Sequence, residues 1–184
     1  MVEKELLEQA ARRLWDADLK KTVCDPVRDF IGTADLDAAY AVQRINTAKR
    51  IRSGAKVIGH KIGLTAPVVQ KQLGVDQPDF GLLWDDKEIK DGGMISVSEL
   101  MQPKAEAEIA FILGKDLDSH NISHEHIVDA IDYAMASIEI VGSRIRTWDI
   151  KITDTIADNA SASHWVVGRQ RVDLKELDLL HCKM

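Results

Sequence analysis

Apolar residues recur every three or four positions in two stretches near the start of the chain. In Glu3–Leu19 the apolar positions share one helical face and charged residues occupy the other, which predicts an amphipathic helix. A second helix is predicted from about Leu36 to Arg52, with Thr33 and Asp35 as candidate N-caps. The chain is therefore expected to begin with a helical region over residues 1–54.

The pattern changes after Gly54 to short β-branched and apolar runs of strand length. These runs are bounded by glycine, proline and polar residues, as strands are. A loop is predicted over Gln77–Gly81, because proline and glycine bracket Asp79. Helices first, then strands with intervening helices, favour an α+β fold over a doubly wound sheet. The predicted strands cover residues 57–62, 106–113, 134–141 and 164–167, and the intervening helices residues 67–73 and 123–131.

Composition indicates one ordinary globular domain. Hydrophobic residues make up 45% and charged residues 29% of the 184 positions, and a chain of this length can bury roughly 70% of its unfolded surface. No linker rich in proline or serine divides it. We expect effectively one domain, with a β-rich catalytic region over residues 55–184 after the helical region.

Charge and cysteine content exclude several classes of function. The 24 basic and 30 acidic residues give a net charge of −6, which argues against binding to nucleic acid or to an anionic membrane. Cys24 and Cys182 are far apart and form no CxxC pair, so neither a zinc knuckle nor a disulfide framework is predicted. The chain has no run of 18 apolar residues and no signal-peptide core near its start, so a soluble, cytoplasmic protein is expected.

Several familiar catalytic motifs are missing. The sequence has no G-x-G-x-x-G, no phosphate-binding G-x-x-x-x-G-K-[ST] and no G-x-S-x-G, so nucleotide-binding and serine-hydrolase functions have no support. His124 and Glu125 begin a zincin-like pattern that fails at Val128. We therefore expect His124 and His126 to lie at an exposed helix start.

Three glutamates stand out as candidate metal ligands. Glu106 and Glu108 are two residues apart in a predicted strand, so they project from the same face, as an exposed strand start would also allow. Glu139 lies between two isoleucines in another strand, where a carboxylate needs a partner. That partner is either a divalent cation shared by the three carboxylates, such as Mg²⁺ or Mn²⁺, or a buried ion pair with Arg144 or Arg146.

Five motifs, taken in order, resemble a known family. They are Gly59–Thr65, Gly74–Gly81, Glu106–Glu108, Glu139–Arg144 and Ala157–Ser161. In this order they resemble the 2-keto-4-pentenoate (2-hydroxypenta-2,4-dienoate) hydratases, which are relatives of 4-oxalocrotonate decarboxylase in the fumarylacetoacetase-like superfamily. The resemblance covers nearly the whole chain. It implies N-terminal helices followed by a mixed β-roll, incomplete at the C-terminus, because the family's chain continues past the position of the last residue.

The resemblance also implies roles for individual residues. Glu106, Glu108 and Glu139 match the family's metal ligands, and the metal acts there as Lewis acid and template. Lys61, which alone would be interpreted as a surface lysine, matches the active-site lysine, and its charge would offset the excess negative charge of the carboxylates and substrate. Asp79 matches the hydratase form and is a candidate for moving a proton between carbon and water; its structural alternative is a role in a turn.

Two further residues are implied to face the substrate. Leu64 would pack beside it, and Ser161, with Asp158 and Asn159 nearby, matches a stretch of the family that faces the substrate, although any of these polar residues could equally cap a turn. The expected reaction is hydration: Lys61 or Asp79 assists proton relocation to a 2-oxo-3-enoate, and water then adds at C4 while C3 is protonated.

Other functions remain open at this point. They are decarboxylation of a 2-oxo-3-hexenedioate, C–C hydrolysis of an acylpyruvate, and a non-catalytic subunit that binds a partner decarboxylase. The resemblance further implies a homo-oligomer, and a decarboxylase or aldolase of the same pathway as a possible partner.

Overall fold

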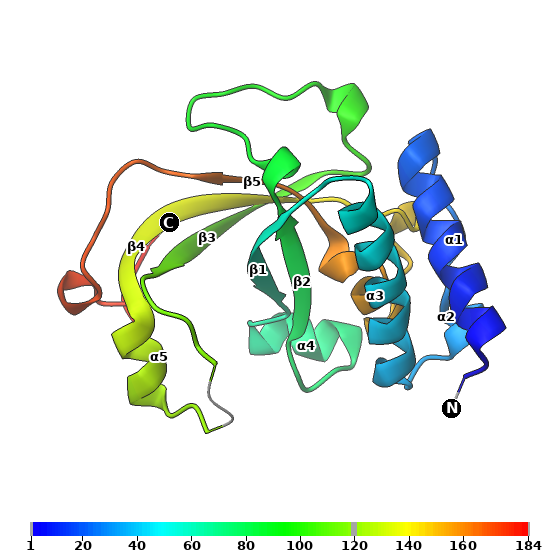
Figure 1. The fold of residues 1–184 in the computed structure, drawn as a ribbon, viewed down its shortest axis with the longest axis horizontal. Coiled ribbons are helices and arrows are strands. Elements are labelled where there is room, and N and C mark those ends of the chain that lie inside the picture. Colours follow the sequence, from blue (N-terminus) through cyan, green and yellow to red (C-terminus); the bar gives the residue numbers. More distant parts are fainter. Residues whose placement is uncertain (1, 119–120, 184) are drawn as a thin grey trace.

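The structure is a computed structural model that describes residues 2–118 and 121–183. Three helices lie together at one end of the molecule, two long curved strands lie at the other, and β1 and β2 lie between them (Figure 1). The helices are α1 (Lys4–Lys20), α2 (Arg28–Ile31), α3 (Leu36–Arg52), α4 (Pro67–Leu73), α5 (His124–Ala130) and α6 (Ile152–Ala157), and the strands are β1 (Val57–Gly63), β2 (Asp79–Trp84), β3 (Lys104–Leu113), β4 (Ile131–Val141) and β5 (Ala162–Val167).

The helical layer forms the apolar core. Ala10 and Leu14 of α1 pack with Ala39 and Val42 of α3, and Ile156 of α6 belongs to the same buried cluster. Helices α1 and α3 confirm the two predicted from the apolar spacing. The predicted cap of α3 is also present, because the Asp35 carboxylate accepts a hydrogen bond from the backbone N–H of Ala38.

The strands form two antiparallel sheets. One sheet pairs β1 with β2, and the other has the order β3-β4-β5. In the second sheet Glu106 is directly opposite Glu139, and Glu139 is directly opposite Trp165. Directly opposite residues point to the same face of a sheet, so the register alone brings two carboxylates side by side. The predicted strands and the helix after Ser123 are confirmed, with His124 and His126 exposed at its start.

The loop predicted over Gln77–Gly81 is wrong for its last three residues. Strand β2 begins at Asp79 and continues through Gly81. A Cβ on Gly81 would lie 2.4 Å from the carbonyl oxygen of Asn159, so this glycine allows a close approach of two backbones within a strand. The same residue type serves turns and close approaches, and the sequence does not distinguish them.

Helices α2 and α6 were not predicted. All six residues of α6 are buried, so the helix has no exposed polar face to reveal its period. Among the described residues, no helix combines the length and apolar character that a membrane span needs.

Candidate active site

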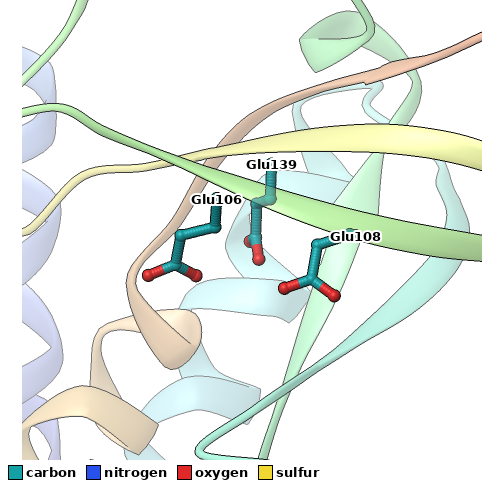
Figure 2. Close-up of side chains that lie close together, drawn as sticks. All are labelled: Glu106, Glu108 and Glu139. Carbon is teal, nitrogen blue, oxygen red and sulfur yellow. The ribbon is translucent and has the colours of Figure 1, made fainter. Parts of the chain in front are cut away.

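The three candidate ligands meet at one point. Glu106 and Glu108 come from β3 and Glu139 from β4, and each offers an oxygen within 4.8 Å of the others. Figure 2 shows the three carboxylate groups extending to the same side of the strands. The prediction that Glu106 and Glu108 share a face is thus confirmed, and the register adds Glu139 to it.

The cluster could hold a cation. Glu139 is 6% exposed, and its Oε1 atom has no hydrogen-bond partner among the described residues. Burial raises the pKa of Glu139 to about 7; the Lys61 ammonium opposes this rise and the two neighbouring carboxylates add to it. Burial and the charge of Glu106 also raise the pKa of Glu108. An unpartnered buried oxygen and three adjacent oxygen ligands fit a hard divalent cation.

Lys61, in the β1–β2 sheet, lies beside the carboxylate cluster of the other sheet. Its side chain is 9% exposed, and Nζ lies 3.2 Å from Oε2 of Glu139. Nζ also donates a hydrogen bond to the carbonyl oxygen of Ala160, at 3.0 Å. Lys61 is therefore not a surface lysine. The alternative ion pair of Glu139 with Arg144 or Arg146 is wrong, because both arginines pair with other carboxylates.

Asp79 lies beside Lys61, at the start of β2. It is 2% exposed, and its Oδ2 atom accepts a hydrogen bond from the Thr155 hydroxyl at 3.2 Å. A Cβ on Gly63 would lie 2.3 Å from Oδ1 of Asp79 and 3.2 Å from Nζ of Lys61, so only glycine fits between these groups. Burial raises the pKa of Asp79, although the charge of Lys61 and the Thr155 hydrogen bond lower it. A buried carboxyl with a raised pKa is suited to carrying a proton.

A left-handed turn contacts Lys61 beside the site. Asn159, Ala160 and Ser161 have φ values of 56°, 51° and 55°. Each left-handed residue other than glycine costs roughly 1–2 kcal/mol, so surrounding contacts must stabilise the turn. The turn directs the Ala160 carbonyl to Lys61, which helps to fix the ammonium beside Glu139.

Contacts on both sides of the turn stabilise it. Arg144 donates hydrogen bonds to the Asp158 carboxylate before the turn and to the Ala162 carbonyl after it. The Asn159 side chain bonds the backbone N–H and C=O of Leu82 in β2, at 2.8 and 2.9 Å. The Asp158 and Asn159 side chains are thus occupied in holding the turn.

Ser161 and Leu64 are the two residues expected to face the substrate. Ser161 is buried, and its Oγ atom lies 3.3 Å from Oγ1 of Thr155. Leu64 directly follows β1 with φ 58° and packs partly against the helical core. Their contact with a substrate stays a prediction. Sequence reasoning missed Thr155 and the Ala160 carbonyl, because neither a threonine in a buried helix nor a backbone oxygen carries a sequence signal.

The raised pKa of Glu139 predicts a pH-dependent metal affinity. The value of about 7 exceeds the usual 4.5, so the metal-free folded protein gains stability from protonation of Glu139 as the pH falls through this range. A cation must displace that proton, and we expect Mg²⁺ affinity to fall by up to about tenfold per pH unit below 7. Calorimetric titration in buffers of different ionisation enthalpy would measure the released proton; an affinity unchanged between about pH 5.5 and 8 would contradict the prediction.

A solved structure defines the class of protein. The structure of 4-oxalocrotonate decarboxylase from Pseudomonas putida G7, complexed with magnesium and adipate, matches with a TM-score of 0.90 and 29% identity, over 97% of this chain and 68% of that one. The fold is therefore of the fumarylacetoacetase-like type, and the three-glutamate cluster lies within it. No protein-family profile matches the chain.

Curated relatives define the family. A 2-keto-4-pentenoate hydratase of Paraburkholderia xenovorans (strain LB400) is 49% identical over 172 residues, which are 94% of this chain and 64% of the relative. A 2-hydroxyhexa-2,4-dienoate hydratase of Comamonas testosteroni is 40% identical over 186 aligned positions, covering 100% of this chain and 70% of the relative. The chain belongs to the 2-keto-4-pentenoate hydratase family. It spans about two thirds of the length of these relatives.

Proposed function

We propose that this protein is a divalent-metal-dependent hydratase. It adds water to a 2-hydroxy-2,4-dienoate, such as the enol form of 2-oxo-4-pentenoate, and forms a 4-hydroxy-2-oxo acid in the catabolism of aromatic compounds by meta-cleavage. The observation that carries the proposal is the convergence of three carboxylates, a buried lysine and a buried aspartic acid from four strands, β1 to β4. The names of the family's members support the same reaction.

Glu106, Glu108 and Glu139 would hold the cation, Mg²⁺ or Mn²⁺. When bound, the cation supplies Lewis-acid polarisation of the 2-oxo or enol oxygen and a template for the substrate carboxylate. The three carboxylates exceed the charge of one divalent ion, and an anionic substrate adds to the excess. Lys61 offsets part of it, because its ammonium lies 3.2 Å from Glu139.

Lys61 and Asp79 would carry out the proton transfers. In the first stage the enol oxygen loses a proton and the terminal carbon gains one, which converts the dienol into a 2-oxo-3-enoate. In the second stage water adds its oxygen at C4, C3 gains a proton and the water loses one, so the net change is the addition of one water. Asp79 can accept and return these protons because burial raises its pKa towards the working range of a general acid. Ser161 and Leu64 would hold the substrate beside it.

Decarboxylation is the second candidate, because the solved structure that matches is a decarboxylase. Both reactions would use the carboxylate cluster and Lys61. Asp79 favours hydration, since the resemblance associates an aspartate at this position with the hydratases and a proton carrier is needed there. A non-catalytic subunit is the third candidate, and it is disfavoured because the proposed catalytic groups all converge on one site.

The test is loss of dienol absorbance when 2-hydroxypenta-2,4-dienoate is added to the protein with Mg²⁺. We expect the absorbance to fall and the 4-hydroxy-2-oxo acid to appear by mass spectrometry, with no release of carbon dioxide. Release of carbon dioxide from a 2-oxo-3-hexenedioate, without hydration of the dienol, would identify the decarboxylase. Unchanged absorbance with the metal-loaded protein would refute the hydratase.

The assembly is a separate part of the proposal. A homo-oligomer is expected from the family resemblance, and a decarboxylase or aldolase of the same pathway is a candidate partner. Sedimentation velocity of the protein alone and mixed with each candidate would test both expectations.

A further inference from the structure

Thr155 links the proposed proton carrier to the residue expected to bind substrate. It lies in α6, is 5% exposed, and its hydroxyl oxygen is 3.2 Å from Oδ2 of Asp79 and 3.3 Å from Oγ of Ser161. Asp79 is in β2 and Ser161 is in the left-handed turn after α6. One hydroxyl thus joins three segments of the chain at the site.

The direction of these hydrogen bonds follows from counting protons. An ionised Asp79 is only an acceptor, so the single proton of the Thr155 hydroxyl points to Oδ2. Thr155 is then left with lone pairs and accepts from the Ser161 hydroxyl. Ser161 therefore donates to Thr155, and Thr155 donates to Asp79. The Ser161 oxygen accepts no hydrogen bond from either of them.

This arrangement distinguishes the two oxygens of Asp79. Oδ2 is engaged by Thr155, whereas Oδ1 has no side-chain partner among the described residues. The backbone N–H groups of Gly63 and Asp79 also lower the pKa of this carboxyl. Oδ1 faces Gly63, which Lys61 also borders. A proton taken up by Asp79 is thus best placed on Oδ1, on the side of Lys61 and the carboxylate cluster, while Thr155 keeps its own proton and its bond to Oδ2.

We propose that Thr155 is a positioning residue for the hydration: it fixes the Asp79 carboxyl so that Oδ1 is the oxygen that exchanges a proton with the substrate. The inference rests on the proposed function through the role of Asp79. At Asp79 itself only O–H bonds are made and broken, because Oδ1 returns every proton that it accepts; the returned protons form the new C–H bonds of the substrate. Thr155 takes part in none of these transfers, and it acts through the orientation of Asp79.

Two charged or titratable groups, Lys61 and Tyr40, bear on Asp79 besides the Thr155 hydroxyl. Lys61 of β1 lowers its pKa and burial raises it. Burial raises the pKa of Tyr40 in α3, and the charge of Asp79 adds to this rise. Among these influences the Thr155 hydroxyl can be removed without a change in charge. It therefore gives a clean test.

The test compares Thr155→Val, which removes the hydroxyl at nearly constant volume, with Thr155→Ser, which keeps it. The matched control is Thr153→Val in the same helix, where a buried hydroxyl donates to the carbonyl of Gly32 at 2.8 Å, away from the site. The first measurement is a ¹³C NMR titration of the Asp79 carboxyl, assigned with Asp79→Asn. We expect Thr155→Val to raise the pKa of Asp79 by about one unit or more, because a hydrogen bond to the charged form is lost.

The second measurement is steady-state hydration. We expect Thr155→Val to lower kcat on the order of tenfold with little change in KM, Thr155→Ser to restore both kcat and the pKa, and Thr153→Val to leave both unchanged. A pKa of Asp79 that does not respond to Thr155→Val would overturn the inference, and so would an equal loss of kcat in both valine variants. If the pKa responds and serine restores it, but the wild-type protein hydrates no dienol, the link from Thr155 to Asp79 stands and the proposed function fails.

Discussion

Glu106→Gln is expected to stabilise the metal-free protein and to remove most of its stabilisation by Mg²⁺. Glu106 is directly opposite Glu139 in the β3–β4 register, and like charges in such a pair cost roughly 0.2–1 kcal/mol. Glutamine removes this repulsion but also removes one of the three ligand carboxylates. This single substitution should therefore raise the stability of the metal-free protein and lower the stability of the Mg²⁺-bound protein.

The size of the metal effect follows from linkage. At Mg²⁺ concentrations 100-fold above the dissociation constant, binding adds about 2.7 kcal/mol to the free energy of unfolding. Loss of a ligand should weaken affinity on the order of 100-fold or more, which leaves about 0.4 kcal/mol at the same concentration. Chemical denaturation with Mg²⁺ and with a chelator would measure both states.

A matched control separates the cluster from general charge effects. Glu176→Gln removes an exposed carboxylate outside the cluster, so it should change neither the metal-free stability nor the Mg²⁺ increment by more than a few tenths of a kcal/mol. Glu106→Gln with an unchanged Mg²⁺ increment would show that Glu106 is no ligand. A metal-free protein made less stable by Glu106→Gln would show that this carboxylate has a favourable partner in the absence of metal.

The elements with one exposed face were predictable from sequence. Helix α1 matches its prediction because it has an apolar face against the core and a charged face towards solvent. Helix α3 matches because Asp35 caps its start and Ser53 follows its last residue. Helix α6 has no exposed face, because all six of its residues are buried, and its polar side chains are satisfied by groups far away in sequence. Asp154, for example, accepts hydrogen bonds from the backbone N–H groups of Val27 and Arg28. Such partners exist only once the chain is folded.

The site residues also differ in whether the sequence alone predicts them. The three glutamates could be inferred from the period of two strands and from the apolar neighbours of Glu139. The involvement of Lys61 and Asp79 was suggested only by resemblance to the family, because their surroundings come from β1, β2 and α6 together. The hydrogen bond from Lys61 to the Ala160 carbonyl could not be predicted. It depends on three consecutive left-handed residues, none of which is glycine, and the local sequence does not indicate them.

Asp79→Asn is expected to lower kcat for dienol hydration by about 10²–10⁴-fold, the contribution typical of a general acid or base. Asparagine has the same shape, and its carbonyl oxygen can still accept the hydrogen bond from Thr155 that Asp79 accepts at 3.2 Å. The carboxylate cluster does not include Asp79, so the Mg²⁺ increment in stability should be unchanged. The loss would then lie in the proton transfers, which an amide cannot perform at neutral pH.

The control and the kinetic signature make this prediction specific. Asp76→Asn makes the same change three residues earlier at an exposed position, and kcat should stay within about twofold of the wild type. Because burial raises the pKa of Asp79, the wild-type pH profile should show an ionisation above the usual range of an aspartate, and Asp79→Asn should remove it. If Asp79→Asn keeps both the rate and this ionisation, the proton carrier is Lys61, whose ammonium borders Gly63 on the same side as Oδ1 of Asp79.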